Sequence, residues 1–233
     1  MLIDGYYTAG STATTVAVSN NAVLLIEITG NLMNIAGTAA IPNPFGGIFL
    51  RNSATGNVIG GAAAGARNVI SGNGNGGVTF ANGSSDNVVT GNYIGVDVTG
   101  LAPLGNTTWG INGFGASDRN RIGGTGAGEA NIIAFTTGGP GVMLGTDEGN
   151  VGVQQWQVLR NSIHSNAALG IELAANGTQA VTPNDAGDAD SGPNALQNFP
   201  VITALVAGGN ATINDGTLFG PRVLAVPAGQ RAR

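Results

Sequence analysis

Residues 77–97 read GVTFANGSSDNVVTGNYIGVD and contain one copy of each of three motifs that recur along the chain. The first motif, a glycine followed by a β-branched residue, starts at Gly47, Gly77, Gly110, Gly141 and Gly170, at intervals of 30, 33, 31 and 29 residues. The second starts at Asn57, Asn87, Asn120 and Asn150, and the third at Asn68, Asn92, Asn131 and Asn161. The chain is therefore a repeat protein with a unit of about 30 residues.

Each unit holds three short segments that are rich in Val and Ile and bounded by Gly and Asn, which is typical of β-strands. No stretch of about a dozen residues sustains the helical period. The pattern predicts an all-β fold, a right-handed parallel β-helix of about five coils with three short strands per coil.

Alternation within the motifs predicts which side chains stack inside the coils. On the first face these are Ile48, Val78, Ile111, Val142 and Ile171, beside Leu50, Phe80, Leu144 and Leu173; on the third face they are Ile70, Ile94, Ile133 and Ile163. Gly113 interrupts the second column, which predicts a bulge in that coil. The Asn residues at matching corners are expected to bond the backbone and one another along the axis.

The repeat also sets the boundaries. We expect a β-helix domain over 1–195, with an irregular first coil at 1–46 that includes a strand at 23–28, regular coils over 47–175 and an acidic loop at 182–194. Residues 196–233 are expected to form a tail of β-strands.

Composition excludes several classes of function. Only 9% of the 233 residues are charged, the net charge is −5, and neither Lys nor Cys occurs. Scattered arginines do not suit a nucleic acid partner, and the absence of Cys excludes disulfides and thiolate sites. The phosphate-binding motif G-x-x-x-x-G-K-[ST] needs Lys, and the glycine-rich run at 72–77 precedes a strand with no helix after it. No nucleotide or redox cofactor is therefore expected. The chain as given shows no signal peptide, and its longest apolar run, 22–26, is too short to span a membrane.

The punctuation G-[IV]-x-[FL] and N-x-I-x-G-N, over about residues 45–175, resembles the right-handed parallel β-helix repeat proteins of the pectate-lyase-like superfamily. The segment NDAGDADSGPNALQNFPVI, 184–202, is similar to the segment that ends such repeats in large bacterial secreted proteins. The resemblance implies a secreted or cell-surface protein that acts on carbohydrate, although fold alone does not fix function.

Candidates for catalysis are few. A glycosidase needs two carboxylates at one cleft, and the nearest pair is Asp147 and Glu148, which a solvated turn explains equally well. His164, the one histidine, is expected to point outward from its strand. Glu172 and Arg121 complete the candidates, and Arg119, Arg121 and Arg160 could each hold a substrate carboxylate.

The acidic loop predicts a metal site. Five oxygen-bearing side chains lie within eleven residues: Asn184, Asp185, Asp188, Asp190 and Asn194. Ca²⁺ takes six to eight oxygens from flexible loops of this kind. The alternative is a surface loop that is held by its own side-chain hydrogen bonds.

Residues that alternate with the inward column should form an outward stripe on the first face. They are Phe49, Thr79, Asn112, Met143 and Glu172, with Trp109 at the edge. Aromatic and polar groups on a flat sheet suit sugar rings, although an ordinary exposed sheet face has the same pattern.

Three functions follow from these features. The first is an extracellular-type β-helix module that binds or processes carbohydrate, with Ca²⁺ as a possible ion. The second is a Ca²⁺-dependent hydrolase of a small ester or lactone, and the third is a structural or adhesive repeat protein. Unpaired strand edges at the two coil ends predict a homo-oligomer unless the terminal segments cover them.

Overall fold

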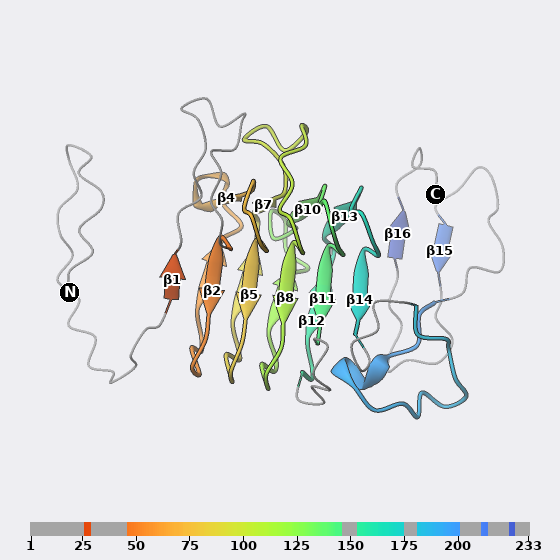
Figure 1. The fold of residues 1–233 in the computed structure, drawn as a ribbon. Helices are drawn as coiled ribbons and strands as arrows, with labels where there is room; N and C mark the ends of the chain where they lie inside the picture. Colours follow the sequence, from red (N-terminus) through yellow and green to blue (C-terminus); the bar gives the residue numbers. More distant parts are fainter. Residues whose placement is uncertain are drawn as a thin grey trace, which may run out of the picture.

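The structure, a computed structural model, describes residues 26–28, 46–145, 153–174, 181–200, 211–213 and 224–226. It is an all-β solenoid in which three parallel sheets wind around one axis (Figure 1). Each strand is only two or three residues long and leads into a corner of the coil. In the part of the chain that is described, no helix is long and apolar enough to cross a membrane.

The first sheet holds the glycine-led motifs. Its strands are β1 (Ile26–Ile28), β2 (Ile48–Leu50), β5 (Val78–Phe80), β8 (Ile111–Gly113), β11 (Val142–Leu144) and β14 (Ile171–Leu173), in that spatial order. Figure 1 shows them side by side along the solenoid. All neighbours are parallel except β1, which runs antiparallel to β2.

The other two sheets have four strands each. The second comprises β3 (Val58–Gly60), β6 (Val88–Thr90), β9 (Arg121–Gly123) and β12 (Gln157–Leu159). The third comprises β4 (Val69–Ile70), β7 (Tyr93–Ile94), β10 (Ile132–Ala134) and β13 (Ser162–His164). The described residues thus make about four complete coils plus the opening strand of a fifth, one fewer complete coil than the motif count predicted.

Short elements complete the description. Two 3₁₀ turns, η1 (Ala64–Ala66) and η2 (Pro193–Leu196), lie in the first coil and beyond the last strand of the solenoid. In the tail, β15 (Ala211–Ile213) pairs antiparallel with β16 (Leu224–Val226), so the described part of 196–233 contains strands, as predicted.

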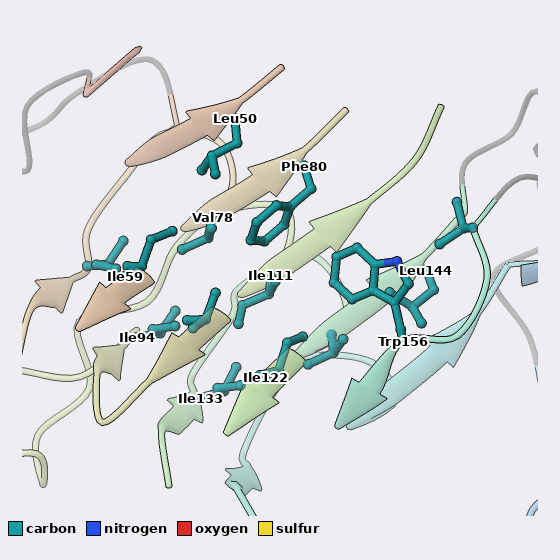
Figure 2. Close-up of a cluster of buried hydrophobic side chains, with 14 of the residues drawn as sticks. Leu50, Ile59, Val78, Phe80, Ile94, Ile111, Ile122, Ile133, Leu144 and Trp156 are labelled. Atoms are coloured by element: carbon teal, nitrogen blue, oxygen red, sulfur yellow. The ribbon is translucent and has the colours of Figure 1, made fainter. Parts of the chain in front are cut away.

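The core contains the columns predicted for the first and third faces and one further column on the second sheet (Figure 2). Register stacks Ile48, Val78, Ile111, Val142 and Ile171 on the first sheet, and Ile70, Ile94, Ile133 and Ile163 on the third. Ile59, Val89, Ile122 and Val158 stack on the second. The column side chains of the middle coils are fully buried. In the end coils Ile48, Ile163 and Ile171 are only partly covered, although Leu50 and Ile70 of the first coil are fully buried.

The predicted bulge at Gly113 is wrong. Strand β8 pairs in register with both neighbours, with Gly113 opposite Phe80 on one side and Leu144 on the other. The missing side chain is replaced by the ring of Trp156, which packs edge-on against Phe80 with centroids 5.3 Å apart. Trp156 stands directly before β12, which lies at Gln157–Leu159 and not after Asn150 as predicted.

Asparagine ladders hold the corners together, as predicted. In the ladder before the third sheet, each Oδ1 accepts from the backbone and the side-chain amide of the Asn one coil earlier, through Asn68, Asn92, Asn131 and Asn161. A second ladder runs through Asn57, Asn87 and Asn120. Because the amides of every ladder Asn after the first coil also donate to a backbone carbonyl of the previous coil, the corners leave few buried polar groups unpaired.

Candidate functional site

The predicted outward stripe is in register across the first sheet, but only its first half is open. Phe49 and Thr79 are half-buried, and Trp109 Nε1 donates a hydrogen bond of 3.2 Å to Thr79 Oγ1. Asn112, Met143 and Glu172 are buried, with exposed fractions of 0 to 3%. The structure therefore brings Phe49, Thr79 and Trp109 together at the surface, and the other three do not form an exposed floor.

His164 lies on the outer side of β13 and is exposed, as predicted. Its ring packs edge-on against Phe135 at 5.7 Å, and Nδ1 lies 3.2 Å from Ser165 Oγ. Asp147 and Glu148 lie outside the described residues. Within the described ranges, no group of three or more His, Cys, Asp or Glu is arranged to hold a metal ion.

The acidic loop is closed by hydrogen bonds between its two ends. Asn184 forms a pair of bonds with the backbone of Phe199. Asp188 Oδ1 accepts from the backbone N–H of Asn198, whose side chain in turn pairs with the backbone of Asp185. These contacts match the alternative of a loop held by its own side chains, and the calcium prediction stays a prediction.

Asn194, the last of the predicted metal ligands, continues the corner ladder. Its Oδ1 accepts from the backbone N–H of Trp156 at 2.9 Å, and its Nδ2 donates to the carbonyl of Trp156 at 3.0 Å. The bond to its Oδ1 is the one that an Asn of the next coil accepts elsewhere in the solenoid. Asn194 therefore caps the end of the second sheet.

A polar cleft of about 370 Å³ lies on the outer face of the second sheet. It is lined by Asp86, Asn87, Val88, Arg119, Arg121, Gln155 and Gln157. Two of the three predicted carboxylate clamps, Arg119 and Arg121, thus meet at one place. The third, Arg160, is exposed elsewhere and donates to the carbonyl of Thr125.

The repeat itself builds the cleft as two parallel columns. Asp86, Arg119 and Gln155 occupy the same corner of successive coils and all have positive φ, of 59°, 53° and 60°. Two residues later, Val88, Arg121 and Gln157 face outward at equivalent positions of β6, β9 and β12. Because stacked strands lie about 4.8 Å apart, the side chains form a regular array along the axis.

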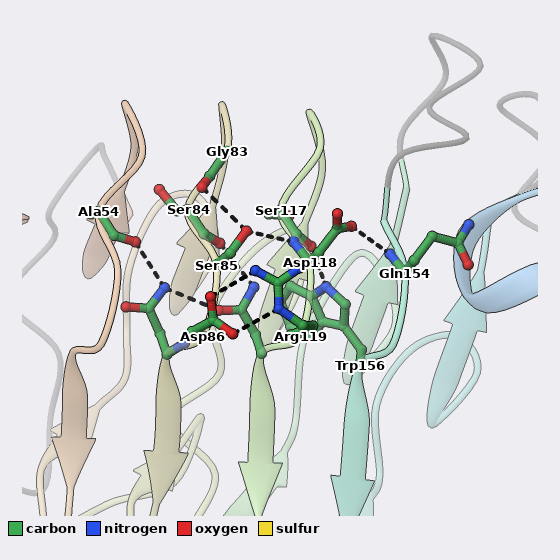
Figure 3. Close-up of polar contacts among 12 residues, drawn as sticks. Ala54, Gly83, Ser84, Ser85, Asp86, Ser117, Asp118, Arg119, Gln154 and Trp156 are labelled. Carbon is green, nitrogen blue, oxygen red and sulfur yellow. Dashed lines mark hydrogen bonds and ion pairs between the residues drawn. The ribbon is translucent and has the colours of Figure 1, made fainter.

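The corner column is held by hydrogen bonds between coils, shown in Figure 3. The Asp118 N–H donates to Ser85 Oγ at 2.9 Å, and the N–H of Gln154 donates to Asp118 Oδ1 at 2.8 Å. Backbone bonds from Asp86 to Asp118 and from Arg119 to Gln154 run in parallel. The wall of the cleft is therefore fixed across three coils.

An ion pair occupies one side of the cleft. Arg119 donates through Nε and Nη2 to the two carboxylate oxygens of Asp86, each at 2.8 Å. These hydrogen bonds from Arg119 lower the pKa of Asp86 below its usual value, and Asp86 raises the pKa of Arg119. Both groups stay charged over the whole physiological range.

Arg121 retains hydrogen-bonding capacity toward a ligand. Its Nη1 donates to the carbonyl of Gly123 at 2.6 Å and lies 3.6 Å from Glu129 Oε2. Its Nε and Nη2 have no acceptor among the described residues, and the exposed amides of Gln155 and Gln157 stand beside it. The cleft can therefore donate several hydrogen bonds to an anionic or hydroxyl-rich ligand.

Sequence reasoning found Arg119 and Arg121 but missed Asp86, Gln155 and Gln157. A signal for two of them was present in the sequence. Asp86 stands one residue before Asn87 of the second motif, and Gln155 stands one residue before Trp156, which takes the equivalent place in its coil. The coil that carries Gln155 has Trp156 in place of the Asn, which hid the alignment.

Comparison with models of known protein families, with curated proteins and with solved structures finds no match to this chain. The parallel β-solenoid is thus shown by the structure alone.

Proposed function

We propose that this protein is a carbohydrate-binding β-solenoid module whose cleft on the second sheet takes an acidic saccharide. The observation that carries the proposal is the array of planar polar side chains around Arg121, in an open cleft whose wall is fixed. Guanidinium and amide groups recognise carboxylates and hydroxyls through paired hydrogen bonds. On this proposal the protein acts outside the cell, where such polymers occur.

Binding is favoured over turnover by the charges in the cleft. Asp86 is the one carboxylate among its lining residues, and both of its oxygens are engaged by Arg119. Glycoside hydrolysis uses two carboxylates that flank the bond. A Ca²⁺ ion in the loop 182–194 remains part of the proposal as a structural ion.

The test compares two single arginine substitutions by titration calorimetry with oligogalacturonate. Arg121→Gln removes the arginine of the cleft that is not paired with Asp86 and is expected to weaken binding on the order of 10- to 100-fold, as for loss of a charged hydrogen bond. Arg160→Gln removes an exposed arginine outside the cleft and should leave the affinity unchanged. Affinity should also fall as salt is raised.

Two results would contradict the proposal. Equal losses in the two variants would show a nonspecific charge effect. The second result is the absence of binding heat when folded wild-type protein is titrated with acidic oligosaccharides at millimolar concentration. That result would rule out a saccharide site in this cleft.

A further inference from the structure

The C-terminal end of the described solenoid leaves part of the core uncovered. The last strand of the solenoid is β14, on the first sheet. Its residues Ile171 and Leu173 continue the inward columns. Ile171 is 45% exposed, whereas Ile111, two coils earlier in the same column, is fully buried. Apolar side chains of the core therefore reach the surface at this end.

Residues 181–200 cross this end and are anchored to the last coil. Besides the pair of bonds between Asn194 and Trp156, the N–H of Asn194 donates to the carbonyl of Val153 at 2.7 Å. The side chain of Gln154 donates to the carbonyl of Gly192 at 2.6 Å. The crossing segment is thus a fixed wall.

Between the wall and the last coil lies a cavity of about 470 Å³. Its apolar lining comprises Leu144, Trp156, Val158, Leu169, Ile171, Leu173, Val181, Leu196, Phe199 and Pro200. Of the seven large hydrophobic side chains that are exposed in the described ranges, four line this cavity: Leu169, Ile171, Val181 and Phe199. Such a concentration of exposed apolar surface marks a binding site.

Five polar side chains line the cavity, those of Glu172, Thr182, Asn194, Gln197 and Asn198, and Glu172 is among those that already have a partner. The amides of Asn194 and Asn198 are used by the backbones of Trp156 and Asp185. The side chains of Thr182 and Gln197 also line the cavity and have no hydrogen-bond partner among the described residues. One hydroxyl and one amide are therefore open to a ligand.

We infer that this cavity binds a small neutral molecule with an apolar body and one hydrogen-bonding group. Its volume lies within the range of small-molecule sites, which are apolar with a few placed polar groups. The anchored wall means that the site is formed before the ligand arrives, which lowers the cost of binding. The cavity shares no lining residue with the saccharide cleft on the second sheet.

The chain provides its own reporter for a test. It has two tryptophans, so Trp109→Phe leaves Trp156, in the cavity wall, as the single emitting indole. Titration of this variant with octanol should give a saturable change in Trp156 emission, and glycerol should give none. Adding Ile171→Phe, which fills the cavity, should weaken the octanol response at least 10-fold. Val58→Phe is the matched control, because Val58 is an exposed strand residue in the first coil.

Three outcomes would overturn the inference. A response that rises without saturation shows partition onto apolar surface and not a site. An equal response in the Ile171→Phe and Val58→Phe proteins places the octanol elsewhere. If light scattering shows a dimer whose formation Ile171→Phe alone abolishes, the occupant is a second copy of the chain.

Discussion

The indole of Trp156 occupies the space that a side chain at Gly113 would fill. A Cβ added to Gly113 would lie 2.4 Å from Trp156 Cζ2. The Nε1 of Trp156 also donates to the carbonyl of Ser117, as the amides of Asn87 and Asn120 do to Ala54 and Ser84 one coil earlier. Trp156 therefore fills the core beside Gly113 and also donates the hydrogen bond that an Asn side chain donates at the corners of the other coils.

The pair predicts a compensating double substitution. Trp156→Asn should cost about 3–5 kcal/mol, because it empties the core beside Phe80. Gly113→Leu should also destabilise, since its side chain collides with the indole. The double variant restores the pattern of the other coils and should be more stable than the sum of the single changes implies, by on the order of 1–3 kcal/mol. Urea denaturation of the four proteins measures this, and strictly additive changes would refute it.

A charge in the core column should unfold the protein. Ile133 is fully buried between Ile94 and Ile163, so Ile133→Asp places an unpaired carboxylate among apolar side chains at a cost of several kcal/mol. Its neighbour Ile132 faces outward and is half-buried, so Ile132→Asp should be much milder. Thermal melting followed by circular dichroism distinguishes the two, and equal melting temperatures would mean the register is wrong.

Breaking the middle of an asparagine ladder should cost more than breaking its end. The Asn131 side chain bonds the backbone and side chain of Asn92, the carbonyl of Val89 and the side chain of Asn161. Asn131→Ala leaves several buried groups without partners, at about 1–3 kcal/mol each. Asn161 is half-buried, so Asn161→Ala should cost less. Denaturant midpoints provide the comparison, and the reverse order would contradict the ladder's role.

Asp97 should make stability fall at acid pH. It is 4% exposed, and its Oδ1 accepts from the Thr99 hydroxyl and from the N–H groups of Thr99, Leu101 and Ala102. The Thr99 hydroxyl and these N–H groups lower its pKa. The folded pKa lies below the unfolded value of about 3.9, so the stabilisation is present above pH 4 and is lost as pH falls through the folded pKa. The melting temperature of the Asp97→Asn variant should approach that of the wild type as the pH is lowered. A difference in melting temperature that does not change with pH would show that Asp97 is not the cause of the acid sensitivity.

The prediction that residues 182–194 bind Ca²⁺ can be tested by calorimetric titration and by thermal melting. An ion that binds only the folded protein raises the melting temperature, and Mg²⁺ should substitute poorly because it demands stricter geometry. Asp190→Ala should remove most of the rise in melting temperature, and it leaves intact the hydrogen bond that the Asn198 N–H donates to Asp188 Oδ1, which closes the loop. If calorimetry gives no signal at millimolar Ca²⁺, hydrogen bonds alone hold the loop.

The strands could be predicted from the sequence wherever the same residue type occupies the same structural position in every coil. At Gly77, Gly110 and Gly141 an added Cβ would press against the backbone oxygen of the motif glycine one coil further on. The spacing of these glycines therefore predicted the register of the first sheet correctly. The prediction failed at Asn150, because the corner role had passed to Trp156, and a search for asparagine could not find it.

The candidate site was harder to predict than the fold. Alternation correctly separated inward from outward side chains, but it could not tell that Asn112, Met143 and Glu172 would be buried while facing outward. Nor does alternation apply at the corners, where positive φ directs Asp86, Arg119 and Gln155 into one column. Because part of the cleft is formed by corner residues, the two-residue alternation of strands could not predict it.

The reversed direction of β1 has a consequence for how copies of this protein can assemble. A parallel solenoid has two unlike ends, and identical copies could stack coil upon coil into an open-ended fibre. The edge of β2 that such growth would need is already bonded to β1, which runs the other way. A β14 strand from another copy cannot add there in parallel, so this sheet cannot polymerise head to tail while β1 remains paired.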